Sequence, residues 1–525
     1  MAVSERTFAD AGPASSAPPR WLDRLDRLVE NWTLGTIGRL GLAGTVLIML
    51  GSFGAGALPA NDPSRTFPVI GLLRHGTAGL HVALGFYYLG LILLVVAWLV
   101  LGRLLLTGAT SGYLPAGRTV VSPARLRTMV IGWMLPLLAG MPLASSDLYS
   151  YAAQAQLARH GLDPYTTTPA DLPAVDLGKF LDNVAWKWVD TPSPYGPLWI
   201  ALSKWVAVGI GNHALISALL LRLLSFGAML AIAWLLPVLA ERYGRRPDLA
   251  LWLAVANPLI VVHTVGGGHN DALMVALMIA GLVLASRPNA NWRHLLAALA
   301  LTTLAAAVKS PGLIAVAFVV PIYLSGRRSL RWPDWLRFCA LAAGIVVAVF
   351  AVVSLIAGVG LGWTKQVSSG VQVINFMSLP TLLAVLYRAV LGVPHAGKLV
   401  DATVRGFRTT GTVLSGLLLI LLWLQAARHR DRPKLVLKLL AVALFSVVVL
   451  GPAVQPWYFS WALTVAAALL VSPRRIHLVA TVSIGLTLLT RPMGSSLEAF
   501  VYIPAVIAAG LAARALLGPI LQRRD

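Results

Sequence analysis

The stretch LGFYYLGLILLVVAWLVLGRLLL, residues 84–106, decides the fold class, because Arg103 is its only charged residue. A helix needs about 20 mostly apolar residues to cross the hydrocarbon core of a bilayer, so this run is long enough to span a membrane. Comparable apolar runs lie at roughly 36–57 and 126–143. The chain of 525 residues is 58% hydrophobic and only 12% charged, far less charge than a soluble protein of this length carries. The sequence therefore predicts an all-α polytopic membrane protein.

The charged residues are distributed unevenly. The chain has 42 Lys plus Arg against 20 Asp plus Glu, a formal net charge of +22, and the basic residues fall mostly in short links between apolar runs. Cytoplasmic links of membrane proteins are enriched in Lys and Arg, so this excess predicts orientation. No basic groove interleaved with aromatic residues is visible, so nucleic acid is not expected as a partner. The single cysteine, Cys339, excludes an internal disulfide and a thiolate metal site.

The charge rule predicts a topology. The basic link after the run at 84–106 is expected in the cytoplasm, which leaves residues 144–211 as a large extracytoplasmic loop. A second outer excursion is expected at 359–408, with a re-entrant or interfacial helix at 377–392. Further spans are expected near 214–239, 249–264, 269–286, 295–308, 312–325, 335–358, 409–427, 435–453, 457–472, 476–490 and 498–517. The total is about 14 spans.

The chain is predicted to form one domain. The N-terminal residues 1–20 are polar and rich in Pro, Ala and Ser, which favours a disordered cytoplasmic tail. Residues 21–525 then form a single transmembrane domain. No repeat separates it into parts.

The most unusual acidic residue is Asp147, in SSDLYSYAAQAQLARHGLDPY at 145–165. Ser145 or Ser146 can cap a helix here, which puts Asp147 in the first turn, where the helix dipole favours a carboxylate. Tyr151 and Gln154 follow at i+4 and i+7 on the same face. An ionised carboxylate facing a polar cavity can accept a proton from a sugar hydroxyl. The alternative is an acid that only caps a helix at the membrane interface.

Other polar residues are expected at the same outer face. Lys309 lies where two short apolar segments meet, and a phosphate is a natural partner for a buried lysine. In GGGHND, His269, Asn270 and Asp271 follow three glycines that let the backbone approach a ligand closely. The alternatives are a lysine that extends to the membrane interface and a flexible turn between helices.

Aromatic residues accompany these polar groups. PSPYGPLW at 192–199 predicts a rigid turn around Tyr195, and QPWYFSW at 455–461 places Gln455, Trp457 and Tyr458 at an outer edge, where sugar rings could stack. An interfacial aromatic belt is the alternative for the second motif. LGKFLDNVAWKWVD at 177–190 is typical of a helix lying at the outer interface.

Taken in order, six motifs resemble one family. They are SSDLYSYAAQAQ, GLDPY, PSPYGPLW, NPLIVVHTVGGGHNDALM, AAAVKSP and QPWYFSW. The chain is similar, over about residues 30–515, to the polyprenol-phosphate-mannose-dependent α-1,6-mannosyltransferases that build lipomannan in actinobacterial envelopes. These enzymes belong to the GT-C superfamily. The resemblance implies a GT-C-type fold in the plasma membrane, with an extracytoplasmic active site and outer-face loop helices.

The resemblance also implies roles for individual residues. Asp147 corresponds to the catalytic base, and His269, Asn270, Asp271 and Lys309 line the donor site. The donor would be polyprenyl-phosphate mannose, and the acceptor a phosphatidylinositol mannoside or a growing mannan, with inversion at the anomeric carbon. Many superfamily members have two clustered acids, whereas here Ser146 precedes Asp147. No cofactor is therefore expected, and a divalent metal is not expected to be essential.

Two other functions remain open on the residues alone. Broken helices and intramembrane charges also occur in lipid-linked-sugar flippases and in transporters of polar solutes. A related GT-C enzyme could use another polyprenyl-phosphate sugar, because hydrogen bonding in the pocket decides which sugar is accepted.

Overall fold

The computed structural model describes residues 32–57, 66–74, 76–107, 120–325, 332–366, 376–392, 401–494 and 502–521. Within these residues the fold is helical and contains no strand. The predicted tail at 1–20 lies outside the described residues. The first helices are α2 Leu34–Ala55, α3 Pro68–Arg74, α4 Gly76–Thr107, α5 Pro123–Ala139, α6 Asp147–Arg159, η2 Pro169–Val175, α7 Gly178–Leu181, α8 Trp186–Val189, α9 Pro197–Ile210 and α10 Ala214–Arg242.

The second part of the described chain contains both regular and irregular helices. Its elements are α11 Pro247–Ala250, η3 Leu251–Val255, α12 Pro258–Ile260, η4 Val261–Gly266, α13 Asp271–Ala285, α14 Trp292–Val308, α15 Gly312–Tyr323, α16 Trp332–Ala357, α17 Trp363–Gln366, α18 Leu379–Val390, α19 Ala402–Arg428, α20 Pro433–Leu450, η5 Pro456–Tyr458, α21 Phe459–Ala467, α22 Pro473–Leu488 and α23 Tyr502–Leu521.

Long apolar helices make this a multi-pass membrane protein. Six helices in the described residues are long and apolar enough to cross a bilayer: α2, α4, α10, α16, α19 and α20. The pair 247–255 and 258–266 adds a seventh candidate that bends by 46°. Pro258 lies at the bend, where it cannot donate a backbone hydrogen bond to the preceding turn. The remaining apolar helices are shorter, so the total of about 14 spans stays a prediction.

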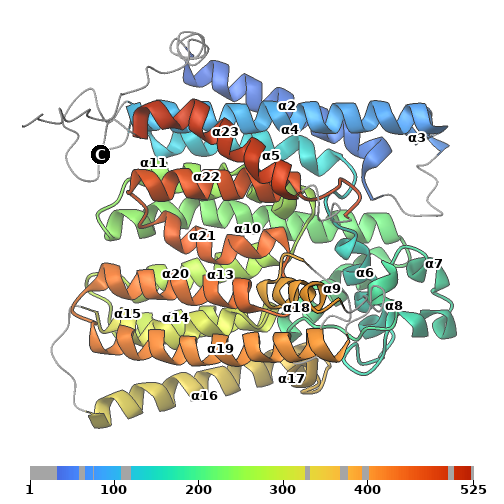
Figure 1. The fold of residues 1–525 in the computed structure, drawn as a ribbon. Helices are drawn as coiled ribbons and strands as arrows, with labels where there is room; N and C mark the ends of the chain where they lie inside the picture. The colour runs from blue at the N-terminus through green and yellow to red at the C-terminus, as the bar shows by residue number, and fades with distance from the viewer. Residues whose placement is uncertain are drawn as a thin grey trace, which may run out of the picture.

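The long helices lie side by side, and short elements gather at one end of them (Figure 1). Helices α6, α7, α8, α17 and α18 are at that end, whereas the link from α19 to α20 and the start of α11 are at the opposite end. Two contacts tie the basic links together there: Ser325 Oγ donates to the Arg430 carbonyl at 2.8 Å, and Lys434 lies against Gly244. The basic links and the loop helices therefore occupy opposite ends of the bundle.

Two predicted elements differ from the structure. The single helix expected over 177–190 is wrong: the segment forms α7 and α8, two helices of four residues. Asp182 ends α7, and the Asn183 side chain donates to the Lys179 carbonyl at 2.8 Å, the kind of local bond with which Asn and Asp favour turns. Helix α19 begins after Asp401, whose side chain caps it, and so overlaps the end of the outer excursion expected at 359–408. The helix expected within it at 377–392 is confirmed as α18.

Candidate functional site

The first residue of α6 is Asp147, and the backbone before it is held from both sides. The Leu143 amide donates to the Gly266 carbonyl at 3.0 Å, and the Ala144 amide donates to the Pro492 carbonyl at 2.7 Å. Ser145 Oγ then accepts the Asp147 amide at 3.0 Å, whereas Ser146, at the N-cap position, makes no capping bond with its side chain. These bonds place the start of α6 beside the end of η4.

The other end of α6 is equally well defined. Gly161 has a φ of 77°, which favours glycine. The Leu162 amide donates to the Leu157 carbonyl at 3.0 Å and the Gly161 amide to the Ala158 carbonyl at 3.3 Å, the pattern that closes many helices. Because both ends are fixed, α6 holds Asp147 on a rigid element.

The Asp147 carboxylate is buried but has few partners. Only 6% of the residue is exposed, and the Trp188 indole Nε1 donates to Oδ1 at 3.2 Å. His269 Nδ1 lies 3.7 Å from Oδ2, beyond hydrogen-bond distance. His269 is in the connection between η4 and α13, and it is 0% exposed. Asp147 therefore keeps oxygen lone pairs available for another donor.

In a second carboxylate at the same end, that of Asp271, both oxygens have hydrogen-bond partners. Lys309 Nζ contacts Asp271 Oδ1 at 2.9 Å and Oδ2 at 3.0 Å, and the Trp461 indole donates to Oδ1 at 2.6 Å. The Lys309 ammonium also lies 4.2 Å from the centre of the Tyr458 ring and 6.0 Å from that of Tyr195. The partly buried charge of Lys309 is thus balanced by Asp271 and by the faces of aromatic rings.

Trp457 packs on His269, in the connection between the two carboxylates. Its ring stacks on the His269 imidazole with centroids 3.6 Å apart, and the His263 ring lies 5.8 Å from it. His269, Asn270 and Asp271 are consecutive, so one short connection contacts Asp147 at its first residue and Lys309 at its last.

The remaining predicted residues support this cluster. The Tyr151 ring packs edge-on against Tyr195, with centroids 5.0 Å apart. Gln154 is bonded through its Oε1 to the Ser193 hydroxyl at 2.9 Å, so its amide oxygen joins α6 to the turn before α9. Gln455 is half-buried and precedes η5, which carries Trp457 and Tyr458.

Two tryptophans were missed by the sequence analysis. Trp188 and Trp461 donate to Asp147 and Asp271, although both lie in segments that look like an interfacial belt. For Trp461 a signal was present, because it follows Trp457 and Tyr458 at i+4 and i+3 and so shares their helix face.

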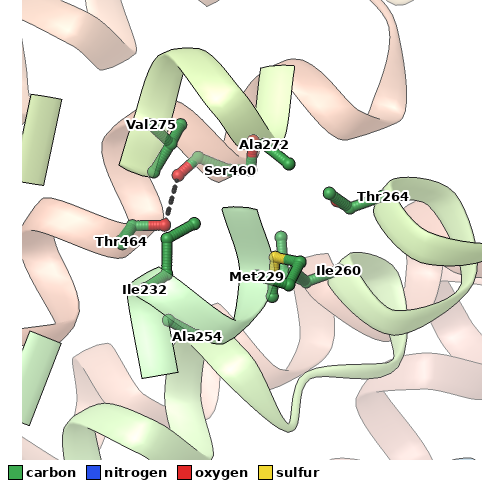
Figure 2. A pocket seen from close by; sticks show the side chains of 9 residues that line it. All are labelled: Met229, Ile232, Ala254, Ile260, Thr264, Ala272, Val275, Ser460 and Thr464. Carbon is green, nitrogen blue, oxygen red and sulfur yellow. Dashed lines mark hydrogen bonds between the residues drawn. The ribbon is translucent and has the colours of Figure 1, made fainter. Parts of the chain in front are cut away.

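Two small cavities border the residues of the site. A cavity of about 10 Å³ is lined in part by residues of η4, α13 and α21. There the Thr264 side chain faces Ser460 and Thr464 (Figure 2). A second cavity of about 10 Å³ lies beside Tyr195 and Ser310. Each has room for about one water molecule. The described residues contain no group of three or more His, Cys, Asp or Glu side chains that could hold a metal ion.

Comparison with known proteins identifies the family. Residues 38–325 match the family model described as Alpha-(1->6)-mannopyranosyltransferase, N-terminal domain. The chain is 36% identical over 496 residues to Alpha-(1->6)-mannopyranosyltransferase A of Mycobacterium tuberculosis. The matched region covers 93% of this chain and 91% of that protein. The chain belongs to the α-(1→6)-mannopyranosyltransferase family. Residues 380–518 also match the MptB C-terminal domain.

Relatives of the α-(1→6)-mannopyranosyltransferase family from Corynebacterium glutamicum are more distant. Alpha-(1->6)-mannopyranosyltransferase A is 28% identical over 79% of this chain and 84% of the relative, and Alpha-(1->6)-mannopyranosyltransferase B is 28% identical over 82% and 72%. No solved structure matches this chain. The site joins the two matched regions, because Asp147 and Lys309 lie in the first and Trp457 and Trp461 in the second.

Proposed function

We propose that this protein is an inverting mannosyltransferase that transfers mannose from polyprenyl-phosphate mannose to the 6-hydroxyl of an α-mannoside acceptor. The names of the relatives support mannosyl transfer. The observation that carries the proposal is the pair of sites joined by His269, Asn270 and Asp271. A carboxylate with unused acceptor capacity lies at one end and a partly buried ammonium at the other.

The chemistry is a single displacement. Asp147 accepts the proton of the acceptor 6-hydroxyl while that oxygen bonds to the anomeric carbon of mannose. The bond from this carbon to the phosphate oxygen breaks, and polyprenyl phosphate leaves with the electron pair. Because the donor is β-linked, one displacement gives an α-linked product.

Lys309 would act on the leaving group. The donor phosphodiester has one negative charge and the released monoester up to two, so a cation close to the phosphate stabilises the transition state. Asp271 already neutralises part of the positive charge of Lys309, because the two side chains form an ion pair. The donor phosphate would therefore have to share Lys309 with Asp271, which makes the pair the key point to test.

The membrane setting follows from the donor. A polyprenyl tail can stay in lipid while its sugar enters the site at the end of the bundle. We propose the extracytoplasmic face of the plasma membrane, a GT-C-type arrangement of about 14 spans, and a phosphatidylinositol mannoside or a growing mannan as acceptor. The position of the basic links at the far end of the bundle supports this orientation.

Transfer is tested with purified protein in proteoliposomes. Radiolabelled polyprenyl-phosphate mannose and a synthetic α-1,6-mannoside should give a longer mannoside whose label is released by an exo-α-mannosidase. GDP-mannose should give no product. A β-linked product, or equal use of GDP-mannose, would contradict the proposal. Movement of the labelled lipid across the bilayer without transfer would support a flippase instead.

Orientation is tested by labelling with an impermeant thiol reagent in a Cys339→Ala background. A cysteine placed at Asp176 in the loop between α6 and α9 should react on intact cells. A cysteine at Asp431 in the link from α19 to α20 should react only after permeabilisation. The reverse pattern would put Asp147 at the cytoplasmic face.

A further inference from the structure

The helices α12, α13 and α14 each follow an asparagine at the N-cap position, and two of these asparagines cap their helices. Asn257 Oδ1 accepts the Leu259 amide at 3.0 Å, and its Nδ2 donates to the Leu253 carbonyl and to Ser483 Oγ at 3.0 and 2.8 Å. Asn291 Oδ1 accepts two amides of α14 at 3.1 and 3.3 Å. This is the usual role of asparagine at a helix start.

Asn270 differs from both. It precedes α13, but its side chain makes no capping bond. The residue is 0% exposed, and neither Oδ1 nor Nδ2 has a hydrogen-bond partner. Burial without a partner is costly for a polar group, and capping would have supplied one. The structure therefore holds this amide away from its local partner.

Unpartnered polar atoms are concentrated in the segment of the chain that ends at Asn270. Seven such atoms lie between His263 and Asn270, more than in any other eight consecutive residues that the structure describes. They belong to His263, Thr264, His269 and Asn270. An isolated orphan could be a local packing defect, but this concentration points to a ligand with several hydroxyl groups.

The position of Asn270 indicates which part of the substrate it meets. His269 lies beside Asp147, and Asp271 is paired with Lys309. In the displacement proposed above, the transferred sugar lies between the attacking oxygen, which is next to the base, and the phosphate, which is next to the cation. Asn270 is the residue between these two positions in the chain.

We infer that Asn270 binds two adjacent ring hydroxyls of the transferred mannosyl unit. One hydroxyl would donate to Oδ1 and its neighbour would accept from Nδ2, which uses both free atoms of the amide. This inference rests on the proposed function and makes Asn270 a specificity-determining residue. A site with a buried amide discriminates against a sugar that lacks one hydroxyl in the right position, because the amide then stays half-paired.

The test compares Asn270→Leu with Asn257→Leu, since both residues precede a helix and both are 0% exposed. Asn257→Leu removes three hydrogen bonds and should lower the melting temperature of the purified protein. Asn270→Leu should leave the melting temperature unchanged or raise it, because it removes atoms without partners. Asn270→Leu should nevertheless lower kcat/KM for polyprenyl-phosphate mannose about tenfold or more.

Epimeric donors give a second readout. Any adjacent pair of ring hydroxyls on mannose includes O2 or O4, so polyprenyl phosphates carrying the C2 or the C4 epimer report on the contact. Asn270→Leu should reduce the preference of the enzyme for mannose over at least one of these epimers. An unchanged preference for mannose over both would overturn the inference.

Two further outcomes would also overturn it. Full transfer by Asn270→Leu would mean that the amide binds only an internal water. A fall in melting temperature as large as that of Asn257→Leu would mean that the amide has a structural role. In either case an active wild-type enzyme would leave the proposed transfer reaction standing, whereas a wild-type protein without transfer would refute the reaction itself.

Discussion

Asp248 and Asp147 are both buried, and each lies in the first turn of a helix. These helices, α11 and α6, are at opposite ends of the bundle (Figure 1). Asp248 accepts four hydrogen bonds: Arg246 Nε and Nη2 at 3.0 and 2.6 Å, and the amides of Val120 and Leu249 at 3.0 Å each. Asp147 accepts one side-chain hydrogen bond, from Trp188. The same residue type is thus saturated at one end and left with spare capacity at the other.

This difference distinguishes a carboxylate with a structural role from one that can act as a base. A carboxylate whose lone pairs are all occupied fixes neighbouring segments but cannot take a proton from a substrate without losing a bond. A carboxylate with free lone pairs contributes less to stability and can act as a base. The predictions below test whether the residues at the α6 end of the bundle follow this rule.

The largest effect after loss of the base itself is expected at Lys309. Lys309→Met should destabilise the protein by roughly 3 kcal/mol, because Asp271 stays buried without its cation. It should also lower transfer roughly 100-fold, because the leaving phosphate loses its cation.

The double variant Lys309→Met/Asp271→Asn removes both charges and keeps an acceptor for Trp461. The melting temperature of the double variant should return toward the wild-type value, but its transfer activity should not. Its KM for the donor should be higher than that of the wild type. Recovery of both properties would mean that the pair is structural only and that Lys309 does not serve the phosphate.

Trp188→Phe should have a smaller effect, a loss of about three- to tenfold in kcat with little change in KM, because one hydrogen bond to the base disappears. Trp186→Phe is the matched control, because Trp186 is on the same short helix and 66% exposed. The same kcat and KM for the two variants would exclude a positioning role for Trp188.

The smallest effect is expected for metal removal. Transfer should survive EDTA, because the predicted base has no second acid beside it in the sequence. The measurement is the initial rate before and after dialysis against the chelator. Complete loss with recovery on adding Mg²⁺ or Mn²⁺ would show that a metal takes part.

Much of the fold could be predicted from the sequence, because long apolar runs with basic ends are typical of membrane-spanning helices. The runs at 36–57, 84–106 and 335–358 correspond to α2, α4 and α16. The start of α6 was also predictable from the serines before Asp147. The helix expected over 177–190 was not, because composition there favoured one amphipathic helix, whereas local side-chain bonds of Asn183 favour a turn.

The contacts within the site were less predictable than its members. The sequence analysis predicted that Asp147, His269, Asp271 and Lys309 lie at the same face of the membrane. In the structure all four lie in one cluster. The partner of Lys309 is Asp271, 38 residues away, a pairing that helix periodicity cannot report. The roles of Trp188 and Trp461 were hidden for another reason: an indole that donates to a buried carboxylate has the same sequence context as one in an interfacial belt.

The most direct test measures Asp147→Asn and Asp248→Asn side by side in purified form. Asp147→Asn should keep the wild-type melting temperature and lose transfer roughly 100-fold or more, because the base is gone while its shape is kept. Asp248→Asn should melt at a lower temperature, with transfer per folded molecule unchanged. If Asp147→Asn kept more than about a tenth of wild-type transfer, or if the two variants lost stability and activity together, the account would be contradicted.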